Sequence, residues 1–290
     1  MPTEALLLVL SAALLHAIWN LAAKRAGGDY RFTFLVGLLV AVLWSPAALW
    51  LGWSALPTWG IAQWSAIFGS AVLHLGYFVV LLRGYRAADL TVVYPVARGS
   101  APLVTALAAL LLLNEQLSTL AATGVLAVCG GILLLAGGTQ FFRGSSNPKR
   151  LQAGLRWGIC TGLLIAGYSV LDGFAVKKLG IHPLMMDYFG NALRVPLLLP
   201  FVWPKRATLA TTLAPQWKAA LMVATLGSLG YILVLQAVTL APLSHVAPAR
   251  EVSMVLAALL GGKLLGEEDR GLRLLGAAVM TTGVILLAIG

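Results

Sequence analysis

Long runs of apolar residues, separated by short polar gaps, follow one another along the whole chain. A helix needs about 20 mostly apolar residues to cross the hydrocarbon core of a membrane. Residues 32–82 contain no charged side chain, and the turn-forming sequence at 57–60 divides them into two stretches of that length. The pattern therefore predicts an all-α integral membrane protein with ten transmembrane helices. Two of them lie within 32–82, and the others are expected near 5–23, 90–113, 117–142, 153–176, 183–203, 217–240, 244–265 and 272–289.

The composition supports this prediction and excludes several soluble classes. Hydrophobic residues make up 60% of the 290 residues and charged residues only 10%, whereas a soluble domain carries about 25% charged residues. So few charges cannot cover the surface of a cytosolic enzyme or keep a disordered chain in solution. The net charge of +10 does not indicate nucleic-acid binding, because the basic residues lie in short gaps between apolar runs.

The cysteines and the small residues add structural expectations but no chemistry. Cys129 and Cys160 lie inside apolar stretches, without a CxxC motif or a Cys/His cluster. We therefore expect two buried hydrophobic side chains, no metal site and no cofactor. Small residues four positions apart let two helices approach closely. They predict a packing face at Gly154, Gly158, Gly162 and Ala166.

The basic residues are distributed unevenly between the two sides of the predicted bundle. Fifteen Lys and Arg belong to the loops after helices 1, 3, 5, 7 and 9 and their flanks, whereas the other side holds only Lys177 and Lys178. Loops rich in Lys and Arg stay in the cytoplasm. The bias predicts that both termini lie outside and the linker at 143–152 lies inside. The fifteen are Lys24, Arg25, Arg31, Arg83, Arg86, Arg143, Lys149, Arg150, Arg156, Lys205, Arg206, Lys218, Lys263, Arg270 and Arg273.

An internal repeat relates the two halves of the chain. Shifted by 152 positions, residues 97–136 align with 249–288 without a gap, and a shift of 149 aligns 14–20 with 163–169. Similar hydropathy alone would not readily place arginine, glutamate and glycine in the same order. The aligned pairs include Arg98 with Arg250, Glu115 with Glu267, Gly124 with Gly276, Gly131 with Gly283, Trp19 with Tyr168 and Asn20 with Ser169.

The repeat predicts two five-helix units, residues 1–142 and 153–290, joined by a linker at 143–152. Because five is an odd number, the two units have opposite orientations in the membrane. Inverted repeats are the architecture of many alternating-access transporters, whose binding site lies near the membrane midplane between the repeats.

These features together resemble the drug/metabolite transporter superfamily, EamA type. The resemblance rests on the two five-helix repeats, the aromatic-polar pair in helices 1 and 6, and the glutamates that precede glycine-spaced helices, and it covers nearly the whole chain. It implies a secondary transporter, usually a metabolite exporter, with a central cavity lined mainly by helices 1, 3, 4, 6, 8 and 9. Ten-helix members commonly have both termini inside, so the charge bias departs from the family's usual arrangement.

Three arginines lie inside predicted spans: Arg98 in helix 4, Arg194 in helix 7 and Arg250 in helix 9. Charged residues are costly there and mark functional sites by default. Arg98 lies about 12 Å along its helix, at 1.5 Å per residue, which is too deep for an interfacial anchor. Two interpretations of Arg98 and Arg250 stay open. They either bind an anionic group of the substrate, or form a structural pair in which Glu251 neutralises one arginine and helix carbonyls satisfy the other.

The glutamates have two expected roles. Glu251 is clearly in the middle of a span, where a buried carboxylate could carry a proton for coupled transport. The adjacent Arg250 favours its ionised form instead, so proton coupling and an ion pair both stay open. Glu115 and Glu267, in the turns before helices 5 and 10, are expected to cap the N-termini of those helices.

Aromatic and polar side chains complete the candidate site. The pair Trp19–Asn20 recurs in the second half as Tyr168–Ser169, which favours cavity-lining positions. His16 shares the helix face of Asn20, although a histidine on a helix is more often structural than a proton relay. The candidate substrate-binding residues are His16, Trp19, Asn20, His74, Tyr94, Arg98, Tyr168, Tyr231, Arg250 and Glu251.

Two features of the sequence leave other functional classes open. His182 and Asp187 match the H-x4-D spacing of glycerolipid acyltransferases, in which the carboxylate orients a histidine base. Pro183, directly after the histidine, instead favours the start of a helix. A non-transporting membrane subunit is the second alternative, and its intramembrane charges would bind the helices of a partner.

The favoured prediction is a multi-pass transporter of the bacterial inner (plasma) membrane that is not an enzyme. It moves a small polar metabolite by alternating access. This metabolite is expected to be anionic or zwitterionic, because the predicted spans hold more basic than acidic groups. Its expected partners are this substrate and the lipid bilayer, and not nucleic acid.

The charge bias makes a testable prediction about orientation. A reporter fused at Gly290 is expected to be active outside the cytoplasm, and one inserted in the linker at 143–152 inside it. Paired phosphatase and fluorescent-protein fusions measure both positions. A C-terminus in the cytoplasm would overturn the prediction and restore the family's usual arrangement.

Overall fold

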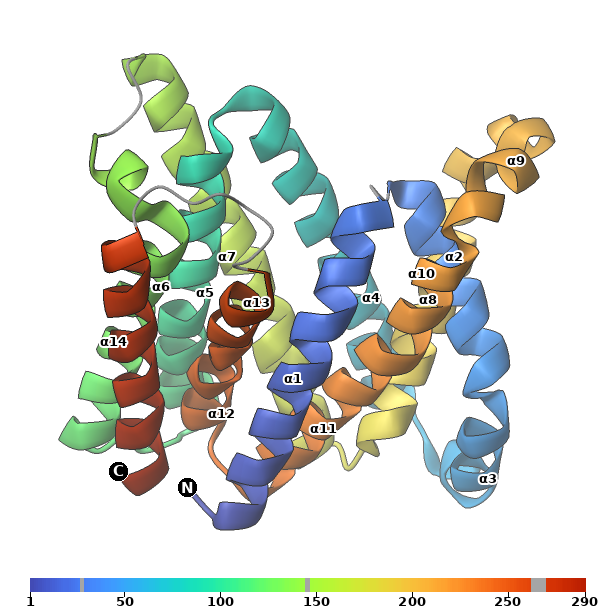
Figure 1. Cartoon of the computed structure of the whole chain (residues 1–290). Helices are drawn as coiled ribbons and strands as arrows, with labels where there is room; N and C mark the ends of the chain where they lie inside the picture. The colour runs from blue at the N-terminus through green and yellow to red at the C-terminus, as the bar shows by residue number, and fades with distance from the viewer. Residues whose placement is uncertain (27–28, 144–146, 262–269) are drawn as a thin grey trace.

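The computed structural model describes residues 1–290 except 27–28, 144–146 and 262–269, and the described residues form helices without a strand (Figure 1). The long helices are α1 (Thr3–Ala26), α4 (Ile61–Ala87), α5 (Leu90–Leu112), α6 (Thr119–Arg143), α7 (Pro148–Lys177), α8 (Pro183–Val202) and α14 (Arg270–Ile289). The shorter elements are α2 (Tyr30–Leu43), α3 (Ser45–Ala55), η1 (Leu56–Thr58), η2 (Trp203–Thr208), α9 (Leu209–Leu213), η3 (Ala214–Gln216), α10 (Trp217–Met222), η4 (Val223–Gly227), α11 (Ser228–Leu240), α12 (Leu243–Ala249), η5 (Arg250–Val252) and α13 (Ser253–Gly261).

The helices confirm an all-α protein with several membrane-spanning segments. Seven stretches among the described residues are long and apolar enough to cross a membrane, or eight if the bent pair of α2 and α3 is one span. One of the seven, Pro183–Leu240, is 58 residues long and extends from α8 to α11. The number of ten spans therefore stays a prediction.

Two irregular helix segments, the bend between α2 and α3 and the π-helical turn η4, contact each other. α2 and α3 meet at an angle of 64°, directly before Pro46, whose ring and missing N–H disfavour a continuous helix. The indole Nε1 of Trp44, at this bend, donates to the carbonyl oxygen of Ala224 at 3.0 Å. Ala224 lies in η4, a π-helical turn, and such turns occur frequently at functional sites.

The helices pack in pairs that bring together segments far apart in the sequence (Figure 1). The most extensive contacts join α6 with α14, α5 with α7, α4 with α7, α1 with α11, and α2 with α8. The predicted stripe of small residues on α7 faces α5, because a Cβ atom on Gly158 would lie 2.8 Å from the Cβ of Val96. The packing role of this stripe is therefore confirmed.

Glycine allows α6 and α14 to approach each other closely. A Cβ atom on Gly124 would lie 2.8 Å from the carbonyl oxygen of Gly283, and one on Gly131 would lie 2.8 Å from that of Gly276. Real Cβ atoms essentially never come this close to another heavy atom, so a larger side chain requires the backbones to separate. The close contact depends on glycine at all four positions.

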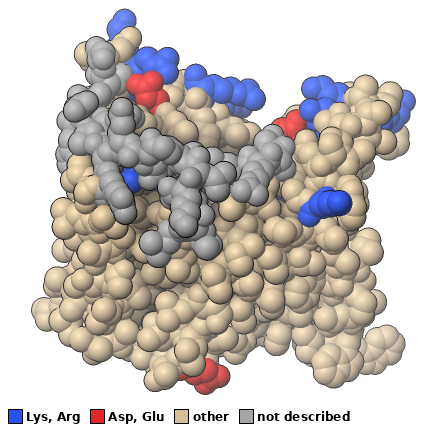
Figure 2. All heavy atoms as spheres, in the orientation of Figure 1, with Lys and Arg blue, Asp and Glu red and all other residues tan. Residues whose placement is uncertain are grey.

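The outer surface of the bundle is apolar, and most of its basic residues lie at one end. Leu111 is 79% exposed and Phe201 is 67% exposed, which is costly in water and is explained by contact with lipid chains. Lys and Arg gather at the end of the molecule opposite both termini (Figures 1 and 2). This arrangement agrees with the distribution of basic residues in the sequence, and the orientation in the membrane stays a prediction.

The expectation for Cys160 needs correction, and the one for Glu267 cannot be compared with the structure. Cys129 is buried as expected, but Cys160 is exposed. The reason is that Gly158 and Gly162 turn the other side of α7 toward α5, which leaves position 160 on the outside. Glu267 lies outside the described residues.

Glu115 joins three parts of the fold at the end of the bundle that carries the termini. Its Oε1 accepts from the backbone N–H of Leu243 at 2.7 Å and from Lys177 Nζ at 3.0 Å, and its Oε2 accepts from the N–H of Ser244 at 2.9 Å. The prediction that Glu115 caps α6 is therefore wrong, since it caps α12 instead. The side chain of Ser118 already accepts the N–H of Ala121 at the start of α6.

These contacts determine the ionisation of Glu115, which lies between two predicted spans. Burial alone would raise the pKa of its carboxyl group. The hydrogen bonds from Ser244 and Leu243, together with the Lys177 ammonium, outweigh burial and hold the pKa below its usual value. Glu115 therefore stabilises this end of the bundle as a carboxylate.

The contact between α6 and α14 predicts a difference between two adjacent glycines. Gly131→Ala is expected to destabilise the protein by about 1–3 kcal/mol through overpacking, because its Cβ would lie 2.8 Å from the Gly276 oxygen. Gly130→Ala is the matched control, because no atom lies within 4 Å of its added Cβ. Unfolding midpoints of the purified variants in detergent measure the difference, and equal midpoints would contradict the proposed close contact.

The environment of Glu115 predicts a pH-dependent loss of stability. Glu115→Gln is expected to cost about 1.5–3 kcal/mol near neutral pH, as for the loss of hydrogen bonds to a charged group. Because folding lowers this pKa, the stabilisation is present above the unfolded-state pKa and is lost as the pH falls through the folded-state pKa. The difference in thermal stability between wild type and variant should therefore shrink on acidification.

A glutamate at the same end of the bundle provides the control for this prediction. Glu4 is exposed in the first turn of α1, so Glu4→Gln should leave the thermal midpoint nearly unchanged at every pH. A Glu115→Gln midpoint equal to that of wild type at neutral pH would show that the contacts of Glu115 do not stabilise the fold.

Candidate functional site

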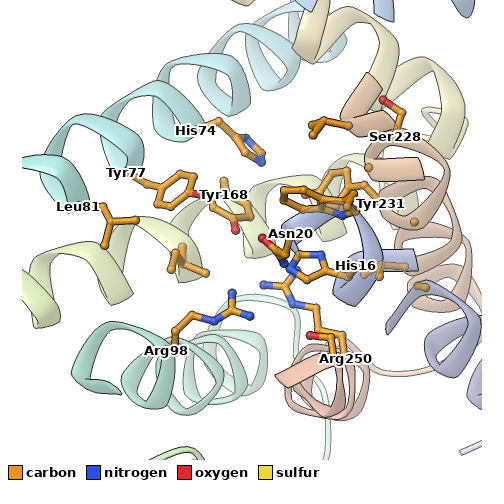
Figure 3. Close-up of a pocket in the computed structure, with 18 of the residues that line it drawn as sticks. His16, Asn20, His74, Tyr77, Leu81, Arg98, Tyr168, Ser228, Tyr231 and Arg250 are labelled. Carbon is orange, nitrogen blue, oxygen red and sulfur yellow. The ribbon is translucent and has the colours of Figure 1, made fainter. Parts of the chain in front are cut away.

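A cavity of about 400 Å³ lies at the centre of the helix bundle (Figure 3). Its lining comes from α1, α2, α4, α5, α7, α8, α11, η4 and η5, with Ser253 at the start of α13. The ten candidate substrate-binding residues predicted from the sequence all line this cavity. They are His16, Trp19, Asn20, His74, Tyr94, Arg98, Tyr168, Tyr231, Arg250 and Glu251. A volume of this size is typical of small-molecule sites.

The carboxylate of Glu251 lies between two guanidinium groups. Its Oε2 lies 2.9 Å from Arg98 Nη2, and its Oε1 lies 3.4 Å from Arg250 Nε. Arg98 belongs to the first half of the chain and Arg250 to the second, and Figure 3 shows both side chains extending into the cavity. The structural interpretation expected Glu251 to neutralise one arginine, but it contacts both. The reason is that α12 packs against α5, so η5, which follows α12, brings Glu251 close to Arg98.

Interruptions of the helices position this ionic group. Pro95 and Pro102 lie inside α5, on either side of Arg98, and each lacks the N–H that a helix would use there. Pro248 ends the regular part of α12, and the chain continues as the 3-10 turn η5, which carries Arg250 and Glu251. The Nη2 group of Arg250 also donates to Ser169 Oγ at 3.3 Å.

Aromatic rings form another wall of the cavity. The rings of His74 and Tyr168 are stacked, with centroids 3.8 Å apart, and the ring of Tyr231 meets that of His74 edge-on at 5.8 Å. His74 Nδ1 lies 2.9 Å from the carbonyl oxygen of Ser70. On α1, the ring of His16 meets that of Trp19 edge-on at 4.7 Å. These contacts hold the rings in place around the open volume.

A polar face of α8 also lines the cavity, although of its residues only Arg194 and Asp187 had been noted in the sequence, and not as a group. Arg194 Nη1 donates to Asn191 Oδ1 at 3.0 Å, and Asn191 Nδ2 donates to Asp187 Oδ1 at 2.9 Å. The resemblance to a known family had indicated helices 1, 3, 4, 6, 8 and 9, which leaves this helix out. The signal was present in the sequence, because Asp187, Asn191 and Arg194 are spaced i, i+4 and i+7 on an otherwise apolar helix.

A further carboxylate lies next to the cavity without lining it. Asp172 of α7 is 0% exposed, and the hydroxyl group of Tyr231 donates to its Oδ2. Its Oδ1 is buried and has no hydrogen-bond partner among the described residues. Tyr231 itself lines the cavity, so it connects Asp172 to the open volume.

The acyltransferase-like pair of His182 and Asp187 does not form a catalytic arrangement. His182 is exposed at the start of α8, where its Nδ1 accepts the N–H of Leu184 at 3.2 Å. It therefore caps the helix, as Pro183 suggested. Asp187 is buried, lines the cavity and is bound by Asn191.

Positively charged side chains outnumber carboxylates among the described residues that line the cavity. Three arginines line it, but only two carboxylates do, Glu251 and Asp187. The Nε atoms of Arg98 and Arg194 are buried and have no hydrogen-bond partner among the described residues. Arginine is suited to bind carboxylates and phosphonates through two parallel hydrogen bonds.

Comparisons with known proteins bear on the fold and on the family of this chain. A crystal structure whose sequence is 18% identical aligns with 100% of this chain and 98% of its own, with a TM-score of 0.76, which shows the fold alone. A search of curated proteins finds no match. The model of the EamA-like transporter family matches two stretches, residues 3–137 and 152–289, which together cover most of the chain. The chain therefore belongs to the EamA-like transporter family.

Proposed function

We propose that this protein is a secondary active transporter, an exporter or permease, that moves a small polar metabolite with an anionic group across the bacterial inner membrane. The substrate is either an anion, such as an organic acid or a phosphonate, or a zwitterion, such as an amino acid. The central cavity binds it, and the two halves of the chain expose this cavity to each side of the membrane in turn.

The observation that carries the proposal is the pair of arginines that share one carboxylate inside the cavity. A single Glu251 cannot balance both Arg98 and Arg250, and Arg194 adds another positive charge. A buried charge without compensation is costly. An anionic group of the substrate supplies that compensation together with acceptors for the unused N–H groups.

Helix packing supports an arrangement of ten spans in two inverted repeats. The contact of α5 with α7 has a counterpart in that of α13 with α1, and the contact of α4 with α7 has one in that of α11 with α1. Gly124 faces Gly283, while Gly131 faces Gly276. This reciprocal pattern is the one expected from a twofold axis between repeat-related helices.

The two ends of the cavity support alternating access. Its lining reaches Tyr85 in the last turn of α4, toward the end of the bundle opposite the termini. At the end that carries the termini, Glu115 holds the start of α12 and Lys177 together. Opening of that end requires these contacts to break, so we infer that Glu115 belongs to the closed gate.

Substitution of the arginines tests the substrate class. Arg98→Gln and Arg250→Gln are each expected to weaken binding of anionic compounds by about 10–100-fold, as for the loss of a charge-assisted hydrogen bond. A suitable panel contains succinate, glutamate and aminomethylphosphonate, with choline as a cation for comparison. Thermal-shift titration of purified protein measures binding, and uptake into proteoliposomes measures transport.

The matched control is Arg156→Gln, which removes an exposed arginine of α7. It should bind the panel like wild type and transport it at the same rate. If wild type prefers choline, and both cavity variants bind choline unchanged, the arginines are structural and the substrate class is wrong. If wild type reconstituted in liposomes moves no panel compound, the proposed transport function is contradicted.

A further inference from the structure

Three carboxylates are buried in or beside the cavity, and their surroundings differ. Glu251 contacts Arg98 and Arg250 directly. Asp187 is linked to Arg194 through the amide group of Asn191. Asp172 has no Lys, Arg or His within ion-pair distance among the described residues, and it is fully buried.

The contacts of Asp172 satisfy only part of an ionised carboxylate. Such a group offers about four lone-pair sites to donors. Oδ2 accepts one hydrogen bond from Tyr231, and the hydroxyl group of Ser70 is a second donor beside the carboxyl group. Oδ1 is buried and makes no hydrogen bond of normal geometry in the described part of the chain. An ionised carboxylate buried without a cation is strongly disfavoured, and such a group takes up a proton instead. Glu251 has the ion pairs that Asp172 lacks, and Asp187 differs from Asp172 in that it accepts from Asn191, whose amide oxygen binds Arg194.

We propose that Asp172 is the proton-binding site that couples this transporter to proton movement, and that it is neutral in the conformation described here. The inference rests on the proposed transport function, and it assigns the coupling role to Asp172 instead of Glu251. Glu251 is unsuited to the role, because two guanidinium groups stabilise its ionised form.

Tyr231 provides the route between Asp172 and the cavity. In the neutral state, the proton on Asp172 Oδ2 donates to the oxygen of Tyr231, whose own hydroxyl proton points toward the cavity. On release, that hydroxyl proton passes to water or substrate in the cavity, while the proton of Asp172 moves to the Tyr231 oxygen. Asp172 is then a carboxylate that accepts a hydrogen bond from a neutral Tyr231, so atoms and charge balance without another reactant. The observed contact between Oδ2 and the hydroxyl oxygen fits both states.

The groups around Asp172 come from α11, α8 and α4, which all pack against α7. α11 contributes Tyr231, α8 contributes Arg194 and Asp187, and α4 contributes Ser70 and His74, with His74 stacked on Tyr168 of α7 itself. The charged groups of α5 and η5, namely Arg98, Arg250 and Glu251, are engaged with one another. The positive charge of Arg194 acts on Asp172, so a closer approach of Arg194 during the transport cycle would favour release of the proton.

Infrared spectroscopy of the purified protein in lipid tests the proton site without any substrate. At neutral pH the wild type is expected to show the carbonyl stretch of a protonated carboxyl group, which shifts in heavy water and disappears on alkalisation. Asp172→Asn should abolish this band. Asp29→Asn is the matched control, since it removes a partly exposed carboxylate that pairs with Arg31 outside the cavity, and it should retain the band.

A second variant keeps the test decisive if Asp172→Asn does not fold. Tyr231→Phe should retain the band but shift its frequency, because the hydrogen bond to Oδ2 is lost. Exchange of the carboxyl proton with heavy water should also slow at least several-fold. A wild type without the band, a band that persists in Asp172→Asn, or an unchanged band with normal exchange in Tyr231→Phe would each overturn the proposal.

Transport in proteoliposomes tests coupling separately. A pH gradient should drive accumulation of the transported panel compound by wild type, whereas Asp172→Asn should exchange that compound at equal pH and ignore the gradient. Gradient-driven accumulation by Asp172→Asn would contradict the coupling role. If wild type moves no panel compound, the proposed function fails, while the infrared band still decides whether Asp172 binds a proton.

Discussion

A carboxylate shared by two arginines at membrane depth is the interaction on which the rest of this structure depends. An arginine in the middle of a span costs at least about 2.5–3.5 kcal/mol on insertion scales, so both guanidinium groups need compensation. Glu251 supplies it for Arg98 and Arg250 together, and it joins the first half of the chain to the second. A single negative charge cannot balance two positive ones, and we infer that the excess selects a substrate with an anionic group.

The cavity also explains where the helices are irregular. Backbone that departs from a regular helix is tolerated inside a membrane where it is buried in protein or lines a cavity, because lipid cannot satisfy its polar groups. The π-helical turn η4 and the 3-10 turn η5 both contribute to the cavity wall. Pro248 accounts for the second of these interruptions, and η5 places Arg250 and Glu251 on the wall. Regular helix elsewhere packs through glycine, as between α6 and α14.

The acidic residues divide into groups with different physical surroundings. Glu115 lies at one end of the bundle, where backbone N–H groups and Lys177 stabilise its charge. Glu251 and Asp187 have arginine partners, directly or through Asn191. Asp172 has hydroxyl groups beside it, of Tyr231 and Ser70, and no ion-pair partner among the described residues. Under the proposed function, these surroundings suit a gate, a binding site and a proton carrier respectively.

The sequence by itself determined the class of protein, the family and ten of the residues that line the cavity. Composition requires a membrane, and the internal repeat picked out Arg98, Arg250, Trp19 and Tyr168, which all line the cavity. The tertiary structure alone decided which partner each charge has. Glu251 contacts Arg98, Glu115 caps α12, and Tyr231 binds Asp172. These pairs are separated by many residues, and helical periodicity gives the face of each helix but not the neighbour that this face meets.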